Sequence, residues 1–76
     1  MKKDIREATG IIIGRNNEYL VCVDVVTGRL RWSNSPYDAW ITRKREHAFK
    51  VAYKVKGTRF LFNPIAGQIR KMGEVQ

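Results

Sequence analysis

Cysteine and histidine are almost absent from this chain, with one of each among its 76 residues. Cys22 alone cannot form an internal disulfide, and one Cys with one His is too few for a zinc site. No apolar run approaches the ~20 residues that a membrane-spanning helix needs. Met1 is followed by lysines and not by an apolar leader, and neither end carries a lipidation signal. We therefore expect a cytoplasmic protein that needs neither membrane nor cofactor.

Acidic residues are also scarce. Seven Asp and Glu stand against 15 Lys and Arg, so the formal net charge is +8 and the isoelectric point is about 10.2. The carboxylates are scattered, His47 falls on the polar side of a predicted helix, and Cys22 is expected to be a buried, inert thiol. These residues predict no catalytic constellation, so we do not expect an enzyme. The surplus of positive charge favours encounters with polyanions instead.

Material for a core is present, because hydrophobic residues make up 43% of the chain and aromatic residues 11%. Disordered chains lack the aromatic and β-branched residues that bury surface. We expect a single domain over residues 1–76, with loose ends at 1–7 and 73–76.

Strand patterns flank a helical one. Residues 11–13, 19–26 and 29–33 are rich in β-branched, aromatic or alternating apolar residues, and Gly- and Asn-containing turns separate them. Another strand is expected at 58–63, and residues 69–72 leave open one further C-terminal strand. The order β-β-β-α-β predicts an α+β fold, a small two-layer sandwich of an antiparallel sheet with one helix packed on a face.

The second predicted strand is apolar on both sides. Simple alternation puts Leu20 and Cys22 on one face and Val21 and Val23 on the other. One helix covers one face of a sheet, so the second face needs the chain termini, sheet curvature or a partner chain. A homodimer formed through the sheet is one of these alternatives.

The helix has two candidate starts. Ser35 and Pro36 suit an N-cap and a first helical position, which gives one long helix over residues 36–56. Alternatively, those residues form a turn and a shorter helix begins at Arg43. Both alternatives end the helix at Gly57, a residue type that favours the position after a helix.

One side of this helix is predicted to be cationic. At 100° per residue, Arg43, Lys50 and Lys54 align opposite the apolar side, and Phe49 and Tyr53 flank them. Such a stripe suits phosphate neutralisation beside base stacking. It is equally the polar outer side that any surface helix needs, in which case the two aromatic rings only widen the apolar seam.

Residues 16–33 followed by a helix resemble the plan of the three-stranded-sheet-plus-helix DNA-binding domains found at integrase N-termini. The predicted strand after the helix departs from that plan, and the resemblance implies a fold without assigning a family. The small size and basic character also resemble accessory proteins of phages and mobile elements.

The leading hypothesis is a small basic nucleic-acid-binding protein that acts mainly through contacts with the phosphate backbone. The alternative is a protein–protein interaction module, an inhibitor, regulator or assembly subunit that docks on an acidic partner or self-associates through its sheet. The candidate phosphate-binding residues are Arg43, Lys44, Arg45, Lys50, Lys54, Arg29, Arg31 and Arg59, and the candidate stacking residues are Tyr53 and Phe49.

Overall fold

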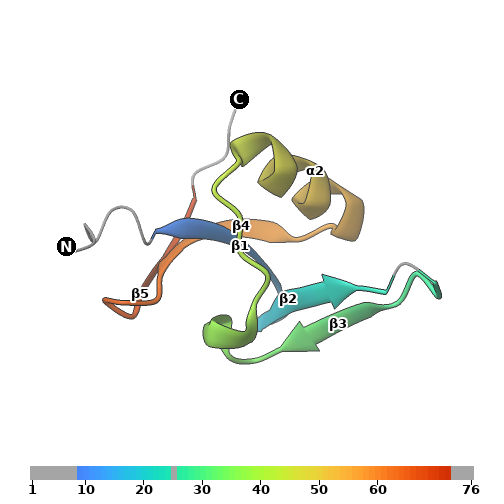
Figure 1. The fold of residues 1–76 in the computed structure, drawn as a ribbon, viewed down its shortest axis with the longest axis horizontal. Helices are drawn as coiled ribbons and strands as arrows, with labels where there is room; N and C mark the ends of the chain where they lie inside the picture. The colour runs from blue at the N-terminus through green and yellow to red at the C-terminus, as the bar shows by residue number, and fades with distance from the viewer. Residues whose placement is uncertain (1–8, 25, 73–76) are drawn as a thin grey trace.

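The computed structural model describes residues 9–24 and 26–72, so the predicted loose ends at 1–7 and 73–76 lie outside the described residues. The elements in chain order are β1 (Gly10–Arg15), β2 (Glu18–Val23), β3 (Leu30–Ser33), the 3-10 helix η1 (Pro36–Asp38), α2 (Arg45–Val55), β4 (Thr58–Asn63) and β5 (Gln68–Lys71). The strands pair antiparallel in the order β3-β2-β1-β4-β5. The predicted α+β fold is confirmed, and β5 is the further C-terminal strand that the sequence left open (Figure 1).

The helix lies on the face of the sheet to which Ile11 and Ile13 point. Both side chains are buried, and strand alternation sends Ile12 between them to the opposite face. The buried cluster on the helix face consists of Ile11, Ile13, Leu20, Ala48, Ala52 and Val55. Because two of the three buried helix residues are alanines, the α2 backbone lies close to β1.

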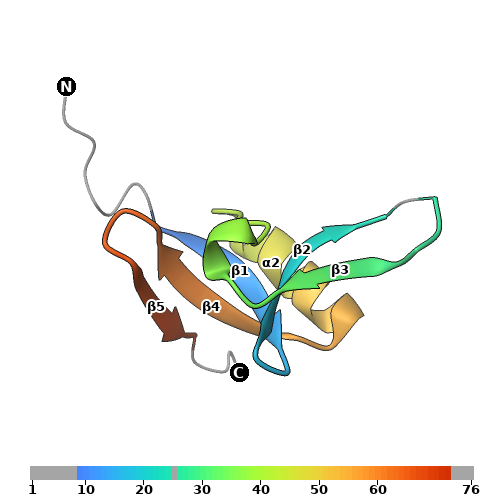
Figure 2. The ribbon, with the colours of Figure 1, turned by 90° about the horizontal axis from the view of Figure 1, so that it is seen from below.

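The second face has a smaller core around Ile12, which is fully buried. Tyr19 packs edge-on against Phe60 with ring centroids 5.9 Å apart, and Tyr37 packs in the same way against Phe62 at 5.1 Å. Tyr37 belongs to η1, which lies on the opposite side of the sheet from α2 (Figures 1 and 2). The η1 segment and these aromatic rings therefore cover part of the second face. The sequence had left three alternatives for covering it: the chain termini, curvature of the sheet, or a partner chain.

The predicted alternation of β2 is wrong. The pairing register with β3 shifts between Leu20 and Cys22, so the extra residue, Val21, interrupts the alternation. Leu20 is buried in the core, whereas Cys22 is exposed and not the buried thiol that its apolar neighbours predicted. No apolar patch that combines Leu20 with Cys22 therefore exists.

Of the two predicted starts, the structure agrees with the turn plus shorter helix, but the helix begins at Arg45, two residues after the predicted Arg43. Ser35 caps only the short η1, where its Oγ accepts a hydrogen bond from the Tyr37 N–H at 3.3 Å. Residues 40–42 then run extended between β1 and β2. The Trp40 N–H donates to the Leu20 carbonyl (2.8 Å), and Thr42 exchanges both backbone hydrogen bonds with Ile11 (2.7 and 3.0 Å). This segment carries the chain from the η1 side of the sheet to the α2 side (Figure 1).

The end of the helix differs from the prediction by one residue. Lys56, not Gly57, takes the left-handed conformation (φ 58°, ψ 44°), and the Gly57 N–H donates to the Ala52 carbonyl at 2.9 Å. Gly57 is needed for a different reason. A Cβ atom there would lie 2.6 Å from the Cγ2 of Ile13, so the glycine lets the helix end approach β1.

Arg15 fastens the end of α2 to the sheet. Its Nη1 donates to the Val55 carbonyl at 2.8 Å, and its Cζ lies 4.8 Å from the centroid of the Trp32 ring. A cation at the carboxyl end of a helix also interacts favourably with the helix dipole. Arg15 thus joins β1, β3 and α2 and is already engaged within the fold.

We expect Arg15→Met to lower the free energy of unfolding by about 1–2 kcal/mol, because it removes a hydrogen bond, a cation–π contact and a favourable charge. Urea unfolding followed by circular dichroism measures the change. Arg31→Met, at an exposed position on β3, is the matched control and should change stability by less than about 0.5 kcal/mol. Equal losses in the two variants would contradict the role given to Arg15.

Candidate nucleic-acid interface

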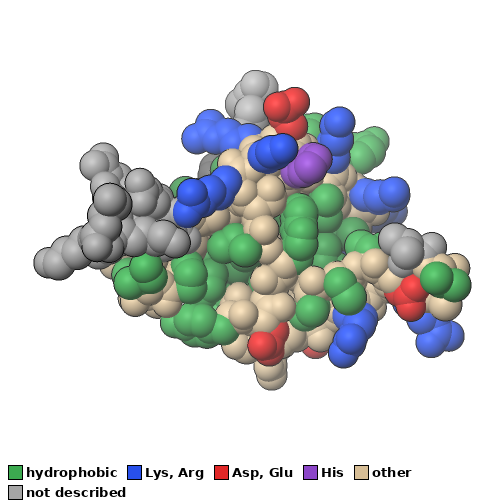
Figure 3. All heavy atoms as spheres, in the orientation of Figure 1, with side chains coloured by type: hydrophobic (Ala, Val, Ile, Leu, Met, Phe, Trp, Pro, Cys, Tyr) green, Lys and Arg blue, Asp and Glu red, His purple; other side chains and the backbone are tan. Residues whose placement is uncertain are grey.

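The outer surface of α2 and the turn before it are densely basic. All five candidate cations of this region are exposed: Arg43, Lys44, Arg45, Lys50 and Lys54. Glu46 is the one acidic residue of α2. The space-filling view shows Lys and Arg side chains gathered over the part of the surface that α2 occupies (Figure 3). Lys50 and Lys54 occupy the predicted stripe on α2, whereas Arg43, which the spacing placed on the helix, lies in the turn before it.

Packing of the inner side determines this orientation. Ala48, Ala52 and Val55 point into the core, so the helical period directs Lys50 and Lys54 outward. Arg43 and Lys44 precede the helix, and Lys44 is its N-cap residue, with no capping hydrogen bond from the side chain. Cations at a helix N-terminus are unfavourable by a few tenths of a kcal/mol each, because the helix dipole is positive there. Local helix stability therefore does not explain this basic turn.

Phe49 and Tyr53 lie one turn apart along the flank of α2 that faces β4. Their side chains are 53% and 81% exposed, respectively, so they do not widen the apolar seam of the helix in the way that one reading of the sequence allowed. The guanidinium carbon of Arg59, on β4, lies 5.4 Å from the centroid of the Phe49 ring. This contact places Arg59, a secondary candidate on the strand that follows α2, next to the helix.

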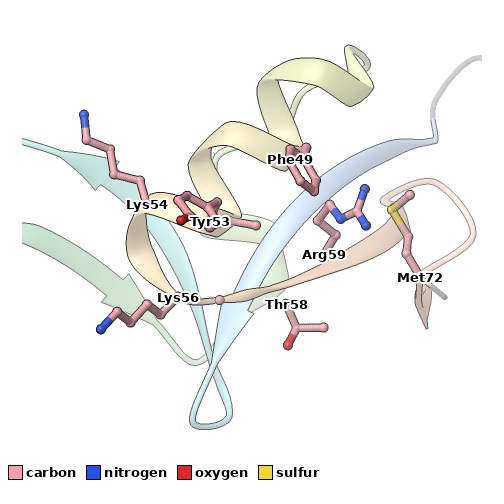
Figure 4. A pocket seen from close by; sticks show the side chains of 9 residues that line it. Phe49, Tyr53, Lys54, Lys56, Thr58, Arg59 and Met72 are labelled. Atoms are coloured by element: carbon pink, nitrogen blue, oxygen red, sulfur yellow. The ribbon is translucent and has the colours of Figure 1, made fainter. Parts of the chain in front are cut away.

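A groove of about 580 Å³ runs between this flank of α2 and β4. Figure 4 shows Tyr53 and Lys54 on the helix side, Thr58 and Arg59 on the strand side, and Phe49 directed toward Arg59. The residues that line it are Phe49, Ala52, Tyr53, Lys54, Lys56, Gly57, Thr58, Arg59 and Met72.

Two residues of the groove were missed at the sequence level. Lys56 borders it at the left-handed turn after α2, and no sequence pattern marks a lysine for that conformation. Met72 reaches it because its N–H donates to the Arg59 carbonyl at 3.0 Å. This placement depends on the register of the β4–β5 hairpin, in which Phe60 lies opposite Lys71, and the sequence alone does not reveal that register.

Arg29 and Arg31 are separated from this surface. Leu30 and Trp32 of β3 pack against the core on the α2 side, so strand alternation sends Arg31 to the opposite face. Arg29 precedes β3 on the projecting β2–β3 hairpin, where its carbonyl accepts a hydrogen bond from the Asp24 N–H at 2.8 Å. The two arginines predicted as secondary phosphate contacts thus do not join the cations of α2, whereas Arg59 does.

Two acidic residues outside α2, Asp24 and Asp38, make hydrogen bonds within local turns. The backbone N–H groups of Val26 and Thr27 donate to the Asp24 carboxylate at 2.9 and 3.3 Å, and these bonds hold the pKa of Asp24 below its usual value. The Asp38 carboxylate accepts a hydrogen bond from the Ser33 hydroxyl at 3.0 Å. Both belong to the β2–β3 hairpin and the η1 turn, and not to the basic surface.

Comparison with protein-family models, with curated proteins and with solved structures finds no match for this chain. Within residues 9–24 and 26–72, no helix has the length and apolar character to cross a membrane. The same residues contain no cluster of three or more His, Cys, Asp or Glu side chains arranged to hold a metal ion. The basic surface and its groove are therefore the features of the described residues that point to a function.

Because Tyr53 is largely exposed, we expect Tyr53→Ser to change the free energy of unfolding by less than about 0.5 kcal/mol. Phe62→Ala is the contrasting variant, since Phe62 is buried and its truncation should cost about 3–5 kcal/mol. Urea titration of both variants makes the comparison. A loss near 2 kcal/mol for Tyr53→Ser would show that this ring stabilises the fold instead of being available to a partner.

Proposed function

We propose that this protein binds nucleic acid through α2, the turn before it and Arg59, mainly by contacts with phosphate groups. The supporting observation is the convergence of exposed cations and exposed aromatic rings on one side of the domain, with Glu46 as the one acid of the helix. Phosphate contacts supply most of the sequence-independent affinity for nucleic acid, and they need cations that are free to move toward the backbone.

The placement of the basic turn adds support. Arg43, Lys44 and Arg45 stand at the amino end of α2, where the helix dipole disfavours positive charge. An anion bound at this end would interact favourably both with the dipole and with the three side chains. The unfavourable interaction of these three cations with the helix dipole is therefore offset when a polyanion is bound, and it is not offset in the free protein.

A single bound strand or helix of nucleic acid can contact the α2 cations together with Arg59. It does not contact Arg29 and Arg31, which lie on the projecting hairpin and on the opposite face. The proposed interface is accordingly smaller than the full set of candidates. It comprises the residues Arg43, Lys44, Arg45, Lys50, Lys54 and Arg59, with Phe49 and Tyr53 as stacking residues.

A second candidate function, a protein–protein interaction module, is favoured by a different surface. Tyr37 and Ile65 are 63% and 60% exposed, and the Tyr37 hydroxyl lies close to Gly67 in the β4–β5 turn. Ile69 shares a sheet face with Phe62, which Tyr37 contacts. Self-association through this apolar region would place the contact on the side of the sheet away from α2. Sedimentation of the wild type and of Ile69→Glu distinguishes a dimer formed there from a monomer.

If about 4–6 phosphates are engaged, the logarithm of the affinity for duplex DNA should fall against the logarithm of salt concentration with a slope of roughly −4 to −5. The triple variant Arg43/Lys50/Lys54→Ala should weaken binding strongly and reduce the magnitude of the slope by about 3, because each lost phosphate contact contributes about 0.9. Fluorescence anisotropy across a salt series measures both quantities.

The matched control is Arg29/Arg31/Lys71→Ala, which removes the same charge from outside the proposed interface, since Arg29 lies on the β2–β3 hairpin and Lys71 lies opposite Phe60 on the sheet face away from α2. It should retain most of the affinity. Equal losses in the two triple variants would attribute binding to net charge alone. Salt-independent binding, or full affinity in the α2 variant, would remove the proposed function.

A further inference from the structure

The groove beside α2 has two compartments that share one wall. The larger lies between Tyr53 and β4, and a second hollow of about 350 Å³ is lined by Arg45, Glu46, Phe49, Lys50 and Arg59. Phe49 and Arg59 line both hollows, and the Arg59 guanidinium carbon lies 5.4 Å from the centroid of the Phe49 ring. Figure 4 shows this pair at the side of the larger compartment. Each compartment thus combines an exposed aromatic ring with cations.

The two rings differ in what they offer a ligand. The Arg59 guanidinium lies over the Phe49 ring, and Phe49 nevertheless remains 53% exposed. Tyr53 is 81% exposed and lines the larger compartment together with Ala52, Lys54 and Gly57. Both rings therefore have surface available for stacking, next to lysines that can pair with phosphate.

A double helix can contact the cations of this surface but cannot stack its bases on the two rings. Its base faces are covered by neighbouring base pairs, so a duplex offers phosphates and groove edges but no free face for Tyr53 or Phe49. In a single strand the bases can unstack and lie against aromatic side chains while the backbone follows a positively charged groove. An acidic peptide matches the charge but does not supply a planar ring beside each anionic group.

Resting on the function proposed above, we infer that the groove selects single-stranded nucleic acid. One base stacks on Tyr53 and a neighbouring base on Phe49, whose ring is held by Arg59. Lys54 and Lys56 contact the backbone beside the first base, and Arg45 and Lys50 contact it beside the second. Duplex binding by the same cations lacks both stacking contacts.

The test is fluorescence anisotropy with a labelled oligo(dT) of about 12 nucleotides, within the range of strand lengths that small binding domains cover, and a duplex of the same length. The single strand should bind more tightly than the duplex at equal salt. Tyr53→Leu should weaken single-strand binding by roughly 5- to 100-fold, the effect of losing one base–aromatic stack, and leave duplex binding unchanged. Tyr53→Phe keeps the ring and should keep the affinity.

Tyr37→Leu is the matched control, because Tyr37 is an exposed tyrosine on the face away from α2. It should not alter binding to either DNA. In a 15N-labelled sample, oligo(dT) should shift the amide signals of Gly57 and Thr58 and leave that of Arg31 in place. Circular dichroism of each variant separates loss of binding from loss of fold.

The possible failures are distinguishable. Equal or tighter binding to the duplex, together with no effect of Tyr53→Leu, overturns single-strand selection and leaves the proposed function standing. Absence of binding to both DNAs overturns both. Poly-glutamate that binds as tightly as oligo(dT) and shifts the same amide signals overturns the inference in favour of an acidic protein partner.

Discussion

The close packing of α2 against β1 is the contact on which the other features depend. Ala48 and Ala52 lie against Ile11 and Ile13, and Gly57 lets the end of the helix approach Ile13 without a side chain between them. Once this side is buried, the helical period leaves no freedom for the rest of the helix. The basic and aromatic side chains must face outward, and the flank that carries Phe49 and Tyr53 must face β4.

The segment between β3 and α2 makes this packing possible. Residues 40–42 pair with Leu20 and Ile11 where β1 and β2 separate, so their polar backbone groups are satisfied while the chain crosses from one side of the sheet to the other. Tyr37 remains on the first side and helps to cover the aromatic core around Ile12. Each face of the sheet thereby receives its own cover from one continuous stretch of chain.

Alternation and periodicity predicted the parts of the fold that depend on local chemistry. The α+β class, the number of strands and the stretch of helix from Arg45 onward follow from those patterns, although β2 ends at Val23 and not at the predicted Val26. The errors fall where a tertiary contact overrides them. A bulge in β2 separates Leu20 from Cys22, and Lys56 takes a left-handed conformation that its residue type disfavours, because the chain must turn there into β4.

The candidate site also has one part that the sequence predicts and one part that only the tertiary structure determines. The basic and aromatic stripe of α2 is a property of the sequence alone, because spacing along one helix determines which side chains are neighbours. Whether Arg59 or Arg31 joins it was decided only by the tertiary structure. The register of β4 against β1 brings Arg59 to the helix face beside Phe49, whereas β3 directs Arg31 to the other face. Helical neighbours are encoded within a few residues, but neighbours from separate strands depend on pairing registers that no local pattern contains.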